Sequence, residues 1–273
     1  MKEFMLEVLF TIQGIGAASG LLYHNEQLFV ISDNSNYLYN FQRDTQQLDK
    51  KLLIEDSVHT RIPKDKKADL EAITQFNETL YLFGSGSTEK RNLLVTYTLA
   101  EEQVERIDLT ETYHSLQTKY GVAPGDFNIE GALAMNDEFW LFNRGNGPRQ
   151  KNGIFVISRS FTPKAYYPIE LPKLHQVPLG FTDATLIDGK IYFIAAAEDS
   201  RSNYLDGEVK GTVWGVIDPR TKALESLQTI SETHKFEGMT CYKESKNKLD
   251  FLLCEDQDGD LDSSNIYQLT IFR

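Results

Sequence analysis

Carboxylate side chains recur at one position of a long repeat. Five segments place an acid or a hydroxyl just before a run typical of a β-strand, at intervals of 52, 59, 53 and 54 residues: Ser19, Glu71, Glu130, Asp183 and Glu237. If the fold brings these residues together, four carboxylates repel and desolvate one another. They must then take up protons, pair with bases or bind a cation.

The side-chain chemistry of this set favours a hard, oxygen-binding cation. The histidines stand at different positions of the repeat and form no cluster by spacing, which argues against zinc. We therefore predict that the five residues bind Ca²⁺, with Mg²⁺ as the alternative, because Ca²⁺ accepts flexible carboxylates and waters more readily than strictly octahedral Mg²⁺. The other interpretation is structural: the acids accept hydrogen bonds from backbone amides and hold neighbouring repeats together.

Basic side chains follow the second strand of three consecutive repeats. They are Arg91, then Arg144 and Arg149, then Arg201. A guanidinium group binds carboxylate or phosphate through two parallel hydrogen bonds, so these arginines predict a pocket for an anionic small molecule next to the cation. The alternative is that they form ordinary salt bridges with neighbouring acids.

Two functions fit these residues. The first is a metal-dependent hydrolase of a phosphoester or, as a second choice, a lactone. The cation would activate water, Arg91 and Arg144 would hold the anion, and Glu71 or Glu130 would act as the base. The second is a non-catalytic protein that binds a ligand or another protein around a structural ion. No Gly-x-Ser-x-Gly elbow, Walker loop or dinucleotide fingerprint occurs in the sequence.

An acidic segment near the C-terminus has carboxylates at alternate positions, as calcium loops do. In Asp256–Asp262 the glycine stands fourth rather than sixth, and no glutamate stands twelfth, so the segment departs from the EF-hand pattern. A solvated hairpin loop and a second cation site both remain as interpretations.

Within each repeat, runs of β-branched and aromatic residues predict strands separated by Asn-, Asp- and Gly-containing turns. Each strand that opens with a residue of the recurring set is followed by an apolar second strand and then a third. The fourth strand is more polar, as an outer edge should be. The predicted second strands are 28–31, 80–83, 139–142, 191–195 and 249–253, and the predicted fourth strands are 49–54, 103–109, 164–171 and 223–230.

The fifth repeat lacks a fourth strand, whereas residues 4–12 form a strand that belongs to no repeat. Pairing this strand with the last repeat closes a ring, which predicts an all-β, five-bladed β-propeller with four-stranded antiparallel blades. We expect one domain over residues 1–273, and residues 113–120 predict a helical turn between blades two and three. A two-domain all-β protein is the alternative. The predicted blades are 13–60, 61–115, 120–172, 175–230, and 231–273 with 4–12.

Composition limits the partners. The chain has 28 basic and 40 acidic residues and a net charge of −12, which argues against duplex nucleic acid and anionic membranes as partners. Its apolar runs are too short to cross a bilayer, and two cysteines cannot form a disulfide framework. The first residues lack the pattern of a signal peptide. We expect a cytoplasmic monomer, or a secreted protein if a signal was removed.

The blade number and the placement of acids resemble the five-bladed propellers of the calcium-dependent nucleotidase (apyrase) family. That resemblance implies an ion in the central channel. Residues 84–87 (Gly-Ser-Gly-Ser) with Arg91, and residues 143–146 (Asn-Arg-Gly-Asn), are more similar to an uncharacterised bacterial propeller family. Phytase-like and lactonase-like propellers resemble this layout but have six blades. Since one fold hosts many functions, these resemblances do not specify a reaction.

Overall fold

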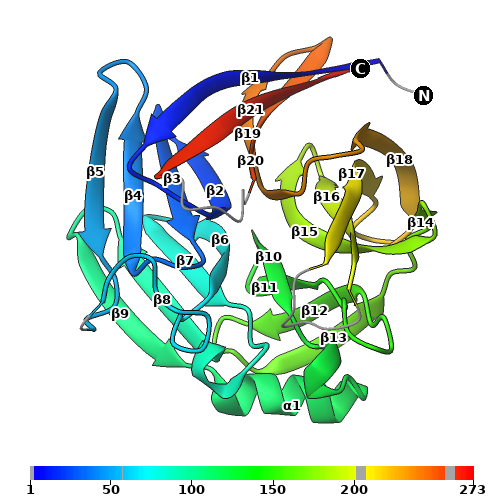
Figure 1. Cartoon of the computed structure of the whole chain (residues 1–273). Coiled ribbons are helices and arrows are strands. Elements are labelled where there is room, and N and C mark those ends of the chain that lie inside the picture. The colour runs from blue at the N-terminus through cyan, green and yellow to red at the C-terminus, as the bar shows by residue number, and fades with distance from the viewer. Residues whose placement is uncertain (1–2, 57, 201–206, 256–261) are drawn as a thin grey trace.

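Five antiparallel sheets form the molecule in a computed structural model that describes residues 3–56, 58–200, 207–255 and 262–273. The sheets stand as blades around a centre, and each presents one edge strand to it (Figure 1). The predicted five-bladed β-propeller is confirmed. No helix in the described ranges is long and apolar enough to cross a membrane.

Consecutive stretches of the chain build the first four blades, each from its inner to its outer strand. Blade 1 comprises β2 (Ala18–His24), β3 (Gln27–Ser32), β4 (Tyr37–Gln42) and β5 (Gln47–Leu52), and blade 2 comprises β6 (Leu70–Phe76), β7 (Thr79–Gly84), β8 (Leu93–Thr98) and β9 (Gln103–Asp108). Blade 3 comprises β10 (Ile129–Met135), β11 (Glu138–Asn143), β12 (Gly153–Ser158) and β13 (Pro163–Pro168).

Blade 4 differs from the four-stranded prediction. It comprises β15 (Val177–Ile187), β16 (Lys190–Asp199), β17 (Glu208–Ile217) and β18 (Leu224–Ser231), and a two-residue strand β14 (Lys173–Leu174) pairs with the start of β15. The chain turns back between β14 and β15 through His175 and Gln176, both with positive φ. The extra strand is therefore the first arm of a tight hairpin that leads into the blade.

Blade 5 joins the two ends of the chain. Its inner strands are β19 (Phe236–Glu244), β20 (Lys248–Glu255) and β21 (Ser263–Phe272), and β1 (Phe4–Gln13) pairs antiparallel with β21 as the outer strand. β19 also packs against β2 of blade 1. The N-terminal strand thus closes the ring, as predicted.

The hydrophobic core is divided among the interfaces between blades. Five apolar clusters of buried residues each combine side chains of two neighbouring blades. Between blades 3 and 4, for example, Phe181 contacts Phe142 and Phe193 edge to face, with ring centroids 5.2 and 5.0 Å apart. Each blade is therefore held by its neighbours, and the ring as a whole fixes where the inner strands begin.

The long interval between the second and third repeats contains a helix rather than a single turn. Helix α1 (Thr110–Tyr120) begins where the carboxylate of Asp108 accepts a hydrogen bond from the Thr110 amide, and it ends at Gly121 with φ 65°. Buried Tyr113 donates a hydrogen bond to the carbonyl of Gly84, which attaches the helix to blade 2.

A β-bulge interrupts the pairing of every inner strand with the second strand of its blade. The register of β2, β6, β10, β15 and β19 shifts by one residue at the same place, leaving one residue in each without a partner on the second strand: Ser19, Glu71, Glu130, Thr182 and Glu237. A bulge redirects a side chain out of the alternating pattern. The five bulges therefore define one ring of side chains at one end of the channel.

Candidate functional site

The ring of bulged residues contains three acids and two hydroxyls. In blade 4 the bulge lies at Thr182, so the sequence alignment of Asp183 with the ring was off by one residue. Ser19 Oγ donates to the Leu70 carbonyl of the next blade at 2.7 Å, and Thr182 Oγ1 donates in the same way to the Phe236 carbonyl at 2.7 Å. The two hydroxyls connect neighbouring blades.

Asp183 also connects blades. Its Oδ2 accepts the Met239 amide of blade 5 at 2.7 Å, and its Oδ1 accepts the Ala184 amide at 2.8 Å. These contacts are the structural alternative that the sequence left open. Burial raises the pKa of Asp183 well above its ordinary value despite these two bonds.

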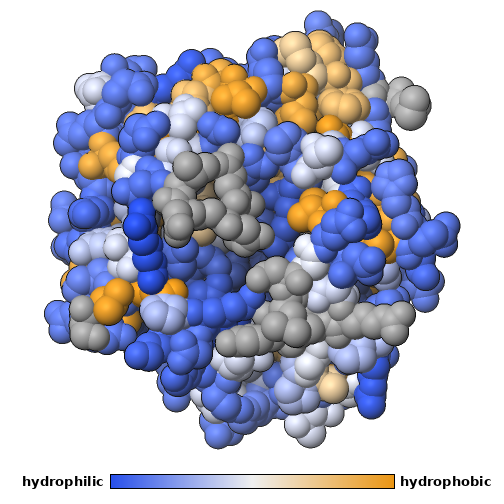
Figure 2. All heavy atoms as spheres, in the orientation of Figure 1, coloured by the Kyte–Doolittle hydropathy of each residue, from blue (hydrophilic) through white to orange (hydrophobic). Residues whose placement is uncertain are grey.

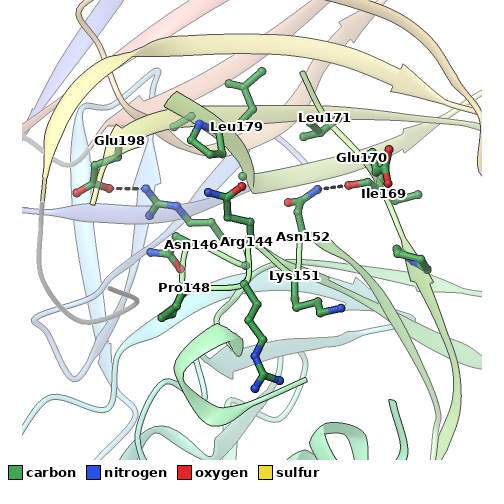
Figure 3. A pocket seen from close by; sticks show the side chains of 18 of the residues that line it. Arg144, Asn146, Pro148, Lys151, Asn152, Ile169, Glu170, Leu171, Leu179 and Glu198 are labelled. Atoms are coloured by element: carbon green, nitrogen blue, oxygen red, sulfur yellow. Dashed lines mark hydrogen bonds and ion pairs between the residues drawn. The ribbon is translucent and has the colours of Figure 1, made fainter. Parts of the chain in front are cut away.

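The acids of blades 3 and 5 belong to a buried ionic network, defined here as the arginine–lysine network: Glu130, Arg144, Glu198, Lys235 and Glu237. Arg144 Nη1 lies 3.0 Å from Glu130 Oε1, and its Nη2 bonds Glu198 (Figure 3). Lys235 Nζ lies 3.4 Å from Glu198 and 2.7 Å from Glu237. Two cations thus join three carboxylates from three blades.

The pKa values in this network diverge. Burial raises the pKa of Glu130 to about 7 although Arg144 opposes the shift. For Glu198, burial is outweighed by Arg144, Lys235 and the Gly207 amide, which together lower its pKa to about 2. A carboxyl group with a pKa near 7 beside one that is ionised at neutral pH is an arrangement found at acid–base sites.

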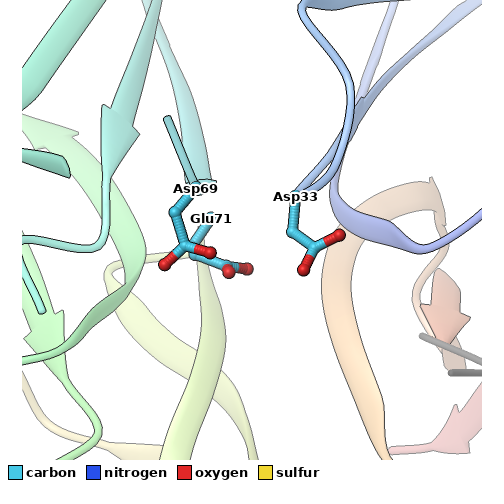
Figure 4. Close-up of side chains that lie close together, drawn as sticks. All are labelled: Asp33, Asp69 and Glu71. Atoms are coloured by element: carbon cyan, nitrogen blue, oxygen red, sulfur yellow. The ribbon is translucent and has the colours of Figure 1, made fainter. Parts of the chain in front are cut away.

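Blades 1 and 2 form a second acidic group, the carboxylate cluster: Asp33, Asp69 and Glu71. One carboxylate oxygen of each lies within 4.8 Å of the others, and such a group can hold a metal ion. Figure 4 shows Asp33 facing the other two from the opposite side. Asp33 follows β3, whereas Asp69 and Glu71 flank the start of β6.

Asp69 is held from several directions. Its backbone has φ 56°, a left-handed conformation that aspartate tolerates better than most residues. Arg91 Nη1 and Ser85 Oγ donate to its Oδ2 at 2.7 and 2.5 Å. Lys67 Nζ lies 2.8 Å from Asp69 Oδ1 and also bonds Asp33. The position of this carboxylate is therefore fixed before any ligand arrives.

The other two carboxylates, Asp33 and Glu71, have raised pKa values. Asp33 Oδ1 is buried without a hydrogen-bond partner among the described residues. Burial raises the pKa of Asp33 to about 6, and Lys67 opposes that shift. Glu71 is only partly accessible to solvent, and burial together with Asp69 and Asp33 raises its pKa well above the ordinary value. Buried polar atoms without partners are rare in native proteins.

The predicted arginines take different roles. Arg91 binds Asp69, Ser87 and the Lys64 carbonyl, and Arg144 binds Glu130 and Glu198, so both position acids. Arg149 is exposed and lines a cavity. Arg201, and residues 256–261 of the acidic loop, lie outside the described residues.

Several residues of the site were not singled out from the sequence. Asp33 directly follows the second strand of blade 1, and Glu198 lies near the end of the second strand of blade 4. Asp69 and Lys235 stand two residues before a bulged glutamate in their blades. The repeat has two such positions, one at the end of the second strand and one two residues before the bulge. Comparing charged residues at these positions across the blades would have identified all four residues.

These observations define a five-bladed propeller with an acidic central face, around which Figure 2 shows hydrophilic residues. The chain belongs to the family of unknown function DUF6929, whose model matches residues 14–271. A search of curated proteins gave no match.

Solved structures agree on the fold. The chain is similar to the glutaminyl cyclase of Myxococcus xanthus, with a TM-score of 0.57 and 13% sequence identity over 97% of each chain. It is also similar to the major allergen Mala s 1 of Malassezia sympodialis, with a TM-score of 0.55 and 9% identity over 96% of each chain. At such identities the likeness concerns the fold alone. The nucleotidase resemblance stays a prediction.

Proposed function

We propose that this protein binds a divalent cation at the carboxylate cluster, with Ca²⁺ as the ion. The observation that carries the proposal is the convergence of Asp33, Asp69 and Glu71 within 4.8 Å. Asp33 Oδ1 is buried without a hydrogen-bond partner among the described residues. A cation would supply the missing charge to buried carboxylates that otherwise repel one another.

The site differs in part from the predicted one. Of the five predicted ligands only Glu71 belongs to the cluster, and Asp33 and Asp69 come from the flanking loops. Ser19 and Asp183 use their side chains between blades. The arrangement favours Ca²⁺ because carboxylates from two separate segments form a site with adaptable geometry, whereas Mg²⁺ demands near-ideal octahedral ligands.

Cation binding is tested by titrating the metal-free protein with CaCl₂ and, separately, MgCl₂ while its melting temperature is recorded. A ligand that binds only the folded state stabilises it by about 2.7 kcal/mol at a hundredfold excess over Kd. We expect Ca²⁺ to raise the melting temperature more than Mg²⁺ does, and Glu71→Gln to abolish the rise. Glu105→Gln, on the outer strand β9 of the same blade, is the matched control. An unchanged melt with both ions would contradict the proposal.

Hydrolysis of an anionic small molecule is the second candidate function. The observation that favours it is Glu130, a buried carboxyl group with a pKa of about 7 held by Arg144 and Asn128 at the channel. A panel of nucleotides, phosphomonoesters and lactones, assayed with and without Ca²⁺, tests it. No turnover of any member would leave the non-catalytic, ligand-binding propeller as the function.

A further inference from the structure

We infer that a cavity between blades 3 and 4 is a binding site for a small organic oxyanion, a carboxylate or phosphate carried on an apolar or aromatic body. The cavity measures about 650 Å³, which lies within the range of small-molecule sites. It borders the arginine–lysine network at Arg144 and Glu198 (Figure 3). It extends to the outer strand of blade 3, where Tyr166 lines it.

The loop between β11 and β12, residues 144–152, forms one wall and is rigidly built. Gly147 packs so closely on the segment before β10 that a β-carbon there would lie 1.7 Å from the Gly125 carbonyl oxygen. The Arg149 amide donates to Asp126 Oδ1 at 2.7 Å, and Asn143 Nδ2 donates to the Lys151 carbonyl at 2.6 Å. A loop fixed in this way presents its side chains with little ordering cost on binding.

Asn152 fixes the opposite side of the cavity to the same loop. Its Nδ2 donates to the Ile169 carbonyl at 2.9 Å, as Figure 3 shows, and its Oδ1 accepts the Phe181 amide of blade 4 at 2.9 Å. The Tyr166 hydroxyl donates to the Lys151 carbonyl at 3.1 Å, which holds the ring at the outer wall. Both walls are therefore preformed.

The charges of the lining indicate the sign of the ligand. Arg144 and Glu198 neutralise each other within the network. Arg149 and Lys151 have no ion pair with a described residue, and Glu170 is the only other acid in the lining. In a chain with a net charge of −12, two cations without acidic partners beside a cavity favour an anionic ligand.

Much of the remaining lining is apolar. Proline, aliphatic and aromatic side chains contribute to it, among them Pro148, Tyr166, Ile169, Leu171 and Leu179, and they lie beside the polar side chains of Asn146, Gln150, Asn152 and Ser200. Such a surface binds a carbon body, whereas a bare inorganic ion would leave it in contact with water. The ligand therefore combines an oxyanion with an apolar group, and its binding does not depend on the carboxylate cluster.

Ligand-observed NMR titrations with phenyl phosphate, phenylacetate, inorganic phosphate and neutral benzyl alcohol test the inference in the presence of EDTA. We expect both aromatic oxyanions, phenyl phosphate and phenylacetate, to bind, one of them more tightly. Inorganic phosphate and benzyl alcohol should bind at least about tenfold more weakly. The double variant Arg149→Gln, Lys151→Gln should bind the aromatic oxyanions about tenfold or more weakly than the parent does. Arg220→Gln, whose side chain is 89% exposed in a distant turn, should change nothing.

Two results would overturn the inference. Equal binding to the double variant and the parent, or binding of no oxyanion, would show that the cavity is not an anion site. Binding that appears only with Ca²⁺ and disappears in Glu71→Gln would place the ligand at the carboxylate cluster instead. The NMR titration is done without cation. A negative result there therefore does not contradict calcium binding, and a negative calcium titration does not contradict oxyanion binding in the cavity.

Discussion

Lys67 is the residue on which the chemistry of the carboxylate cluster depends. Its ammonium group contacts Asp33 and Asp69, two of the three groups that can hold a metal ion. Burial alone would lower the pKa of Lys67, but Asp69 and Asp33 raise it above its ordinary value, so the lysine stays charged. The ammonium group of Lys67 is thus a cation within the protein that shares Asp33 and Asp69 with any divalent ion bound at the cluster.

Replacement of this lysine should make the protein dependent on calcium. Removing one partner of a buried ion pair typically costs about 3–5 kcal/mol, because the other charge remains buried. We expect Lys67→Met to melt at a lower temperature than the parent in EDTA and to gain more from Ca²⁺, measured by thermal unfolding. Lys164→Met, which removes a more exposed pair with Glu138, is the control. An equal calcium response in variant and parent would show that Lys67 and the ion do not compete.

Glu130 should make stability depend on pH. Its pKa is about 7 in the folded protein against an ordinary value of 4.5, because burial raises it more than Arg144 lowers it; Glu237 raises it further and Lys235 lowers it. Because the folded state binds the proton more tightly, the stabilisation is complete below the ordinary pKa and is lost as pH rises through the folded pKa.

The difference between the parent and Glu130→Gln isolates this effect. Measured by urea unfolding in EDTA, the stability of the parent relative to the variant should fall between about pH 5 and about pH 8. Glu198 titrates well below this window, since its pKa is about 2. A difference that is constant with pH, or that grows, would show that Glu130 is ionised throughout.

At the scale of elements, the sequence predicted the strands better than the side chains that they orient. The repeat located the five inner strands and the closing strand because hydrophobic alternation and turn residues are local signals. It misplaced the ring in blade 4, where Thr182 rather than Asp183 occupies the bulge. A bulge shifts the register by one residue and leaves no signature in the residue types themselves.

The partners of charged groups were also beyond sequence reasoning. Arg91 and Arg144 could have faced a ligand or an acid, and only the packing of blades shows that each binds carboxylates of the site. Asp33 meets Asp69 through contact between two blades, so their 36-residue separation in sequence carries no information about it. The acids of the flanking loops were recognisable as neighbours of the ring, but not as a cluster.

At the scale of the whole molecule, blade 5 is the only blade built from both ends of the described chain. The other four blades are each continuous in sequence, whereas β1 pairs with β21 from the far end of the described chain. Phe4 and Leu6 pack against the core between blades 4 and 5, and Ile12 is buried in the core between blades 5 and 1. The closing strand β1 therefore contributes apolar side chains to two of the five interfaces between blades.

Removal of β1 should consequently affect solubility more than an ordinary terminal truncation does. Deleting residues 4–12 leaves the hydrogen-bonding groups of β21 unpaired along an exposed edge, which is a template for association with other chains. We expect the truncated protein to be insoluble or oligomeric by size-exclusion chromatography with light scattering. Val8→Ser is the control, because the Val8 side chain is 53% exposed and its loss preserves the strand. A synthetic peptide of residues 3–13, added during refolding, should restore a monomer by filling the vacant edge. A truncated chain that is monomeric and unfolds cooperatively on its own would show that four complete blades and a three-stranded fifth suffice, and that β1 does not secure the ring.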